Sequence, residues 1–509
     1  MERHHKALAT TSHQSQGAGS YSLVDRFSSL PDAVVSHILS YLNAFDLIQV
    51  SSVSKKCGEL SVSVSGLDFD VNAMPGGKVW WMRSKLLNYL DRLWMRRENI
   101  NIDRFRVCWV FEGVTSRTCE EHCRVISWIY AAVRCNVEKL DLQITLNYKE
   151  KPTSLELPGC TFRCASLTSL TLDLKFCILK TPSVSSCTNL QSLLLRSVCI
   201  EKDFFEWISS SCQCIKELTI DCVLSSTIIC IEIPSLEFIH FVFVGRRQLY
   251  TDIDALSISG ENLQHIHVEH IDLRSSACHY KLSITAPNVK YLKLNGNVAH
   301  RLSVEKFIHS EEAVIFLNPG EGGFDKVVFD VVSCILGVKV LRLNATTIKA
   351  LFKYEGSMLG QFDNIRQLYI HTKGLEKDLI AAVVSLLSGM PTLSSLNIKS
   401  EPNNRQLKCV EPTSVSVGKK WRAQRMACID QLKEVTIEIS NGNKELELAR
   451  FLLEDAKNLK KMVLQLSDWS YSPKKVLLAR KLSSYSSNLN MAANIDHINS
   501  TATIVFEAA

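Results

Sequence analysis

Two hydrophobic rhythms follow one another along the chain, and each predicts a different kind of element. Between residues 30 and 60 apolar positions recur three and four residues apart, which gives an α-helix one apolar face. Beyond residue 135 a six-residue pattern returns repeatedly, with apolar side chains at its first, fourth and sixth positions. The alternation within this pattern is typical of a short strand with one buried face.

The helical segment predicts three short helices. Pro31 suits a first helical position, and Asn43 suits the N-cap of a second helix, because its side chain can accept a backbone N–H. Ser51 or Ser52 is the expected cap of a third helix. Three helices in about thirty residues cannot bury their own apolar faces. We therefore expect a partner or the following domain to cover part of this surface.

The six-residue pattern occurs twelve times, and most copies lie 21 to 30 residues apart. The copies begin at residues 137, 167, 190, 215, 236, 263, 289, 338, 365, 393, 432 and 459. One gap of 49 residues leaves room for a degenerate copy at 312–317. This is the signature of leucine-rich repeats, which stack one strand per repeat into a curved solenoid. A large mixed α/β domain with many edge strands is the alternative, and the quasi-regular spacing favours the solenoid.

Strand alternation predicts which side chains the concave face of such a solenoid displays. In each copy the fourth and sixth residues point inward, so the third, fifth and seventh point out. The first repeats then display an acidic entrance of four residues: Asp141, Asp173, Glu217 and Asp221. The middle repeats display eight candidate residues for binding a substrate: His240, His265, His267, Tyr291, Lys293, Arg342, Tyr369 and His371. Aromatic and arginine side chains dominate many interfaces, which makes this centre the candidate recognition surface. An ordinary polar strand surface is the alternative for any one of them.

The motif HIHVEH at residues 265–270 raises the question of a metal site, since His265 and His267 share one face of a strand and His270 follows closely. Without a cysteine or an acid in register, we interpret it as a polar strand surface and expect neither a metal nor a cofactor. The sequence also contains no P-loop, HExxH or GxSxG motif. It therefore gives no positive reason to expect an enzyme.

Composition narrows the class of protein. The chain is 46% hydrophobic with a mean hydropathy of +0.04, enough for a large core. A net charge of +6 spread along 509 residues does not indicate a nucleic-acid partner. No apolar run reaches the roughly 18 residues of a membrane helix, and residues 1–20 hold no apolar signal region. The 18 cysteines are scattered without a CxxC pair, which favours reduced thiols. We expect a nuclear or cytoplasmic protein without a membrane partner.

The helical segment resembles the F-box, the adaptor-binding motif of ubiquitin-ligase substrate receptors. The residues that carry the resemblance are Leu30, Pro31, Asp32, Val34, His37, Ile38, Leu39, Ser40, Leu42, Asp46, Leu47, Ser51, Ser54 and Lys55. Together with the repeats, nearly everything after residue 24 resembles the plant F-box/LRR proteins that carry a C-terminal FBD domain. The stretches at 66–70, 91–107 and 125–142 fit that family, and residues 428–466 form the FBD-like stretch.

The resemblance implies an α/β fold: a small helical F-box, a leucine-rich-repeat solenoid and an FBD-like strand–helix unit that closes the open end of the array. The expected boundaries are a disordered tail at 1–24, the F-box at 25–65, a helical connector at 66–135, repeats at 136–400, a polar insertion at 401–427 and the cap at 428–509. Within the cap, one helix face is expected to collect Leu446, Ala449, Leu453 and Ala456. The last ten residues are expected to form a final strand.

The resemblance also implies the substrate-recognition subunit of an SCF-type E3 ubiquitin ligase. Its F-box is expected to bind a Skp1-like adaptor and, through it, a cullin and a RING subunit, while the repeats hold a protein substrate. Such a receptor makes no bond itself and acts by proximity. The expected adaptor-binding residues are Leu30, Pro31, Val34, Ile38, Leu39, Leu42, Leu47 and Val53.

Three positions depart from the family pattern. Cys57 stands where the family has Trp, Gln49 where it has a basic residue and Asn43 where it has Pro. An aromatic anchor buries about 150–250 Å², so its loss at an interface would weaken adaptor binding. The alternative function is therefore a repeat-based binding scaffold with a degenerate F-box that does not drive ubiquitylation. An enzyme with an unrecognised site is the third alternative.

Overall fold

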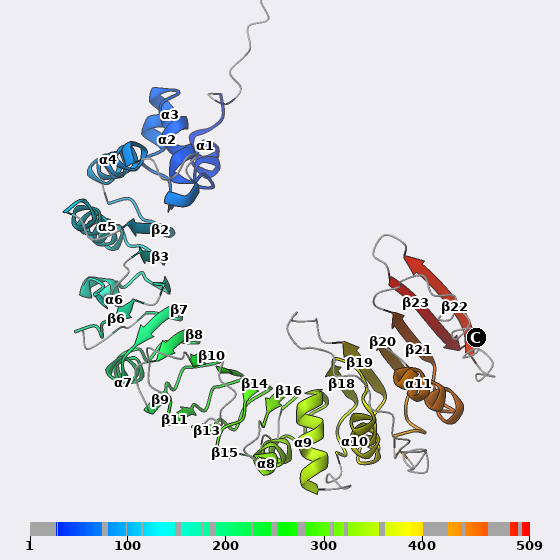
Figure 1. Cartoon of the computed structure of the whole chain (residues 1–509). Helices are drawn as coiled ribbons and strands as arrows, with labels where there is room; N and C mark the ends of the chain where they lie inside the picture. The colour runs from blue at the N-terminus through cyan, green and yellow to red at the C-terminus, as the bar shows by residue number, and fades with distance from the viewer. Residues whose placement is uncertain are drawn as a thin grey trace, which may run out of the picture.

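The computed structural model describes residues 27, 29–73, 80–97, 99–112, 116–147, 154–175, 177–183, 187, 189–224, 228–245, 253–272, 280–305, 307, 310–319, 324–355, 362–400, 426, 428–439, 443–466, 489–496 and 501–508. These residues form a crescent with helices at one tip and a β-hairpin at the other (Figure 1). The predicted tail at 1–24, and the predicted insertion at 401–427 apart from Met426, lie outside the described residues.

Three short helices form the N-terminal tip: α1 (Asp32–Leu39), α2 (Ala44–Ser51) and α3 (Lys55–Leu60). Asn43 caps α2 as predicted, since its side chain accepts the Asp46 N–H at 3.0 Å. The cap of α3 is Ser54, which accepts the Cys57 N–H at 3.1 Å, and not Ser51 or Ser52. Those two serines belong to the end of α2, where Ser52 is the C-cap, so they cannot start the next helix. Pro31 lies one position before α1, as its N-cap residue.

The segment predicted as a helical connector at 66–135 already contains the first strands of the solenoid. It holds β1 (Gly66–Asp70), the 3₁₀ turn Val71–Ala73, α4 (Trp80–Arg96), β2 (Arg104–Glu112) and α5 (Ser116–Arg134). β1 pairs with β2, and β2 pairs with β3 (Lys139–Asn147), both in parallel. The repeats therefore begin about seventy residues before the predicted boundary at 136. Both early strands carry the six-residue pattern, as VSGLDF at 64–69 and IDRFRV at 102–107, and the sequence prediction overlooked these two copies.

Parallel strands then continue one per repeat along the inner side of the crescent (Figure 1). Their bounds are β5 Ser169–Asp173, β7 Ser192–Ile200, β8 Glu217–Leu224, β10 Phe238–Gly245, β12 His265–Asp272, β14 Tyr291–Asn297, β16 Glu312–Asn318, β17 Val340–Asn344, β18 Gln367–Thr372, β19 Ser395–Ser400, β20 Glu434–Ile439 and β21 Lys461–Leu466. The degenerate copy predicted at 312–317 is thus the strand β16. β16 pairs in parallel with β14 on one side and with β17 on the other.

The outer side of the crescent carries short strands and helices (Figure 1). The helices are α6 Gly159–Arg163, α7 Lys202–Ser211, α8 Asp325–Cys334, α9 Ala345–Glu355, α10 Lys377–Ser388 and α11 Asn443–Asp455. The strands are β4 Ser154–Leu155, β6 Ile178–Leu179 and a four-stranded sheet of β9 Ile228–Glu232, β11 Ala255–Ser259, β13 Lys281–Thr285 and β15 Arg301–Val304. One hydrophobic core runs between the two sides. Within the described residues, no helix is both long and apolar enough to cross a membrane.

The C-terminal tip ends the parallel stack with two antiparallel strands. β22 (Leu489–Asp496) and β23 (Thr501–Ala508) form a hairpin, and β23 pairs with β21. The final strand was predicted, whereas its reversed direction was not. In α11 the predicted apolar face is present: Ala449, Leu453 and Ala456 are buried, and Leu446 packs against the core at its edge.

Candidate functional site

The N-terminal tip exposes an unusual share of large apolar side chains. Val34, Ile38 and Tyr41 follow one another at helical spacing on α1 and just beyond it, with exposed fractions of 43%, 39% and 77%. Val53, between α2 and α3, is 77% exposed, and Pro31 is exposed at the start of α1. We call these five residues the apolar patch. Tyr41 was missed by the sequence prediction, although its spacing of seven from Val34 places it on the same helix face.

Four predicted adaptor-binding residues face the protein interior. Leu39 and Leu47 are fully buried in the core, and Leu30 and Leu42 are half-buried against it. In this conformation Leu39 and Leu47 offer no surface to a partner, and we reassign them to packing beneath the apolar patch. Helical periodicity marked these positions as apolar, but it does not say which of them the following domain covers.

Two of the three departures from the family pattern, Cys57 and Asn43, are accommodated within the tip, whereas Gln49 is exposed. Cys57 is only 4% exposed, so this position points into the core and leaves no gap in the apolar patch. Asn43 supplies the cap of α2, and its side-chain amide also donates to the Asp46 carboxylate at 2.8 Å. Lys56 ties α3 to the start of α1 through an ion pair of 2.8 Å with Asp32 and a hydrogen bond to the Leu30 carbonyl.

A buried arginine fixes the tip to the solenoid. The Arg97 guanidinium donates to the carbonyls of Val62 at 3.0 Å, Val64 at 2.7 Å and Asn101 at 3.0 Å. Val62 and Val64 precede β1, and Asn101 precedes β2. One side chain therefore joins the exit from the helices to the first two strands. The helical tip and the first repeat are bonded as one body.

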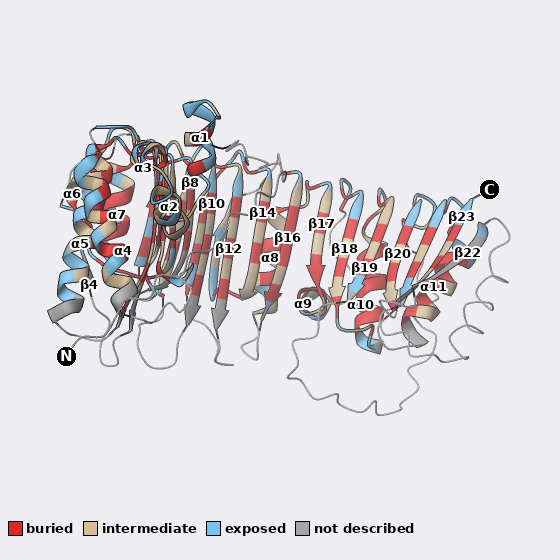
Figure 2. Cartoon of the chain, turned by 90° about the horizontal axis from the view of Figure 1, so that it is seen from above, coloured by how far each residue is buried: buried red, intermediate tan, exposed pale blue. Residues whose placement is uncertain are grey.

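The concave face follows the predicted alternation. Along β5, for example, Leu170 and Leu172 are buried while Ser169, Thr171 and Asp173 are half-exposed, and the same banding recurs from strand to strand (Figure 2). All eight predicted residues of the middle repeats lie on this face. Because the strands pair in register, His240, His267 and Lys293 lie side by side in one row across β10, β12 and β14. Arg342 and Tyr369 continue that row on β17 and β18.

Asp141 of the acidic entrance is paired with a cation. Arg106 on β2 bonds the Asp68 carboxylate at 2.9 Å and lies 3.3 Å from Asp70 and 3.6 Å from Asp141. Burial raises the pKa of Asp141, against the opposing effect of Arg106. The sequence prediction missed this compensation because it did not place β1 and β2 in the sheet. Asp141 therefore belongs to a bonded network, whereas Glu217 of the entrance stays exposed.

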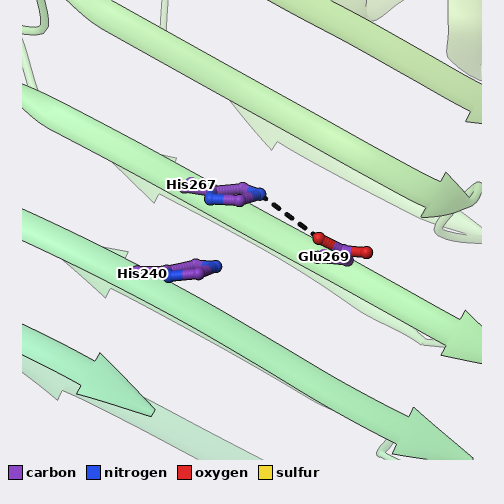
Figure 3. Close-up of side chains that lie close together, drawn as sticks. All are labelled: His240, His267 and Glu269. Carbon is purple, nitrogen blue, oxygen red and sulfur yellow. Dashed lines mark ion pairs between the residues drawn. The ribbon is translucent and has the colours of Figure 1, made fainter. Parts of the chain in front are cut away.

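The two histidines at the centre of the face stack closely. The rings of His240 and His267 are 4.0 Å apart and nearly parallel, at 7° (Figure 3). Glu269, two residues further along β12, lies with a carboxylate oxygen 3.4 Å from His267 Nε2. The pKa of His240 is lowered to about 4, chiefly by burial and in part by the adjacent His267. The pKa of Glu269 is lowered chiefly by its interaction with His267.

Further along the row, a cation and aromatic rings make a second cluster. Arg342 pairs with Glu312 on β16 at 2.6 Å, and its guanidinium lies 4.0 Å above the Tyr369 ring. His371 lies beside Phe316, 4.9 Å between ring centres, and burial lowers its pKa, with Lys399 adding to the effect. This cluster offers flat aromatic surface and a held guanidinium, the chemistry of a protein-binding hot spot.

The HIHVEH motif does not bring its three histidines together. His265 and His267 face the concave side, whereas His270 is buried on the opposite face and stacks on Phe243 at 4.3 Å. The group that does converge is His240, His267 and Glu269, whose ligand atoms all lie within 4.8 Å of one another. Glu269 was overlooked as an acid in register, although its spacing of two from His267 puts both on one strand face.

Comparisons with known proteins agree with this architecture. Residues 27–67 match the F-box domain family, and residues 125–318 match the family described as FBD-associated F-box protein At5g56370, LRR repeats. Among curated proteins of Arabidopsis thaliana, the FBD-associated F-box protein At1g66310 is 23% identical over 460 residues, covering 88% of this chain and 91% of that protein. The F-box/FBD/LRR-repeat protein At2g26030 is 22% identical over 480 residues, covering 91% and 96%.

A third relative, the F-box/LRR-repeat protein At4g14096, is 26% identical over 463 residues, covering 86% of this chain and 87% of its own. Each of these three similarities covers at least 86% of this chain. The chain thus matches the F-box model at its N-terminal tip and the FBD-associated LRR model in the repeats that follow, and it is similar over most of its length to plant F-box/LRR-repeat proteins of the FBD type.

Proposed function

We propose that this protein is the substrate-recognition subunit of an SCF-type E3 ubiquitin ligase. Its F-box binds a Skp1-like adaptor and through it a cullin and a RING subunit, and its concave face binds a protein substrate. The observation that carries the proposal is the apolar patch. Among the described residues, ten large hydrophobic side chains are exposed, and four of them lie within residues 34–53.

The apolar patch has the character of a docking surface for a protein. Several exposed apolar side chains gathered on one small helical unit are costly in water and are typical of sites that a partner covers. A standard interface needs about 800 Å² per partner, which three short helices with their connecting turns can supply. The packed residues beneath, Leu39 and Leu47, hold α1 and α2 in place so that the patch is preformed.

The concave face supports the second half of the proposal. Its middle repeats gather stacked histidines, a guanidinium over a tyrosine ring and further aromatic side chains on one rigid sheet. Such a receptor needs no catalytic group of its own, because it raises the local concentration of substrate near the conjugating enzyme. The bonds from Arg97 keep the adaptor-binding tip and the substrate-binding face in a fixed relation. We place this activity in the nucleus or cytoplasm.

Co-expression with a Skp1-like adaptor followed by size-exclusion chromatography tests the proposal. We expect wild type to elute as a one-to-one complex, and Leu30→Ala/Pro31→Ala and Ile38→Asp to lose it. Ile38→Asp places a charge in the apolar patch and is expected to weaken binding by about 100-fold or more. Met95→Asp on α4 is the matched control, since Met95 is 85% exposed and lies outside the patch.

The opposite results identify the alternative function. A wild type that remains monomeric beside the adaptor would mean that Cys57, Gln49 and the other departures have disabled the F-box. The protein would then be a repeat-based scaffold that does not drive ubiquitylation. Equal loss of the complex in Met95→Asp and Ile38→Asp would show that the apolar patch is not the docking surface.

A further inference from the structure

The centre of the concave face holds a set of side chains with the composition of a metal site. His240 comes from β10, and His267 and Glu269 come from β12, the next strand in the sheet. Both imidazole rings point along the strands toward the side where the Glu269 carboxylate lies (Figure 3). One ligand atom from each of the three residues lies within 4.8 Å of the other two.

The two imidazole nitrogens that would face an ion make no hydrogen bond within the described residues. Nε2 of His240 and Nε2 of His267 are both shielded from solvent, and neither has a hydrogen-bond partner among the described residues. The contact of His267 Nε2 with Glu269 is close enough for an ion pair at 3.4 Å but is not aligned as a hydrogen bond. Shielded polar atoms are normally satisfied, so two neighbouring exceptions on one face call for a ligand.

We propose that His240, His267 and Glu269 bind a divalent transition-metal ion, Zn²⁺ in the first place. Two imidazoles and one carboxylate suit Zn²⁺ and related ions of borderline softness, whereas Mg²⁺ and Ca²⁺ prefer oxygen alone. With metal–ligand distances of about 2.0–2.2 Å, two ligand atoms of a tetrahedral ion lie about 3.4 Å apart. The His267–Glu269 edge already has that length.

The remaining adjustment falls on His240. Parallel rings send their lone pairs along parallel lines, so one imidazole must tilt to aim at the same ion as its neighbour. The rings stand 4.0 Å apart, and rotation about the χ2 bond is soft for histidine, so this tilt moves no backbone. A neutral imidazole is the form that ligates a metal ion.

Neighbouring charges partly oppose the ion. Lys293, opposite His267 on β14, places a positive charge near both His240 and Glu269. Asp221 on β8 acts in the other sense from the far side of β10, close enough to interact with Glu269. The site is therefore nearly balanced by its surroundings, and removal of Lys293 should tighten it.

Three protein ligands leave at least one coordination position open to the hollow of the crescent. A side chain of a bound protein that can ligate Zn²⁺, such as cysteine, histidine or a carboxylate, would complete the shell. This role rests on the proposed function of the concave face. Metal binding itself does not, and it is measured on the purified chain without any partner.

The test titrates Zn²⁺ against a chromophoric chelator, and Co²⁺ by its absorption, into the full-length chain and matched variants. Because the chain has 18 cysteines, a metal ion could also bind to thiolates, and Co²⁺ distinguishes the two kinds of site. Thiolate ligands give Co²⁺ a near-ultraviolet charge-transfer band, whereas imidazole and carboxylate ligands do not. We expect one equivalent bound without that band. Loss of a ligand should cost at least as much as loss of an outer-shell partner, so His240→Asn and His267→Asn should each weaken binding by about 100-fold.

Two further variants sharpen the result. His265→Asn, the other concave histidine of β12, should leave the affinity within about twofold because it lies outside the cluster. Lys293→Met should increase the affinity several-fold, an effect that damage to the fold cannot imitate. Wild type without a thiolate-free Co²⁺ site, or a site unchanged in both His240→Asn and His267→Asn, would overturn the proposal. Failure of adaptor or substrate binding would leave these measurements unaffected.

Discussion

The first and the middle repeats share the same strand geometry, but their concave side chains differ in how far they are bonded to one another. In the first, Arg106 gathers the carboxylates of Asp68 and Asp70 from β1 and approaches Asp141 on β3, so three strands are cross-linked through their concave side chains. In the middle, His240 and His267 stack across two strands while their Nε2 atoms find no hydrogen-bond partner among the described residues. One region is internally bonded, and the other keeps polar atoms available.

The difference teaches where to look for binding on a repeat surface. A charged side chain whose partners already lie on adjacent strands loses those bonds when a ligand approaches, and so contributes little net affinity. A shielded polar atom without a partner gains a bond on binding and was already desolvated. The amount of charge on a face is therefore a weaker guide than the number of its unsatisfied atoms.

Charge reversal in the middle repeats should produce the largest effect. Lys293→Glu/Arg342→Glu reverses both cations of the central row and is expected to weaken capture of a protein substrate by about 100-fold, or roughly 3 kcal/mol. Most of this loss is expected from Lys293, since Arg342 already pairs with Glu312 on the adjacent strand. The measurement is quantitative pull-down of the substrate, with adaptor binding as an internal control that should not change. Arg104→Glu/Lys139→Glu reverses two exposed cations of β2 and β3 and is the matched control. Substrate capture unchanged in the Lys293/Arg342 variant would contradict the assignment.

Arg106→Met should give the next largest effect, on stability. It leaves Asp68, Asp70 and Asp141 close together without their cation, and the free energy of unfolding should fall by about 2 kcal/mol, since partial exposure screens the repulsion. Urea denaturation of the full chain measures this fall. Arg104→Met on the same strand, which is exposed, should stay within about 0.5 kcal/mol. Equal stability of the two variants would mean that the network does not hold the first strands together.

His267→Asn should have the smallest effect on stability in metal-free buffer. The side chain makes no aligned hydrogen bond, so its loss should change the free energy of unfolding by no more than about 0.5 kcal/mol. Urea denaturation beside Arg106→Met completes the comparison. A loss as large as that of Arg106→Met would show that the middle histidines are structural, as the early charges are.

The sequence predicted the concave residues well because a strand has a strict period of two. Once the six-residue pattern located β10 or β17, the outward position of His240 or Arg342 followed. Partners across strands were harder to predict. The Arg106 network depends on β1 and β2, whose copies of the six-residue pattern were overlooked because they precede the predicted start of the repeats. Their place in the sheet became clear from the strand pairing. The cluster of His240 with Glu269 needed the register between two repeats, which fixes which residues become neighbours.

The helical tip shows a different limit. Apolar periodicity placed Val34, Ile38 and Leu39 on helices correctly, but α1 is apolar over more than one face, and sequence alone does not say which face the first repeat covers. The structure assigns Leu39 to the covered face and Val34 to the exposed one. Cys57 is a related case, since a departure from the family pattern gives no indication of whether it points outward or inward.

The reversed strands at the C-terminal tip have a consequence for polymerisation. Every parallel strand in the stack offers its neighbour the same row of amide and carbonyl groups, so an open end is a template on which a second molecule could continue the sheet head to tail. At one tip, the bridge from Asn43 to Asp68 places the F-box against the free edge of β1. At the other, β23 runs against β21, and the outermost β22 presents an edge in a different direction from that of the repeats. The repeating interface is thereby interrupted at both ends, which disfavours end-to-end fibres in a protein whose architecture would otherwise permit them.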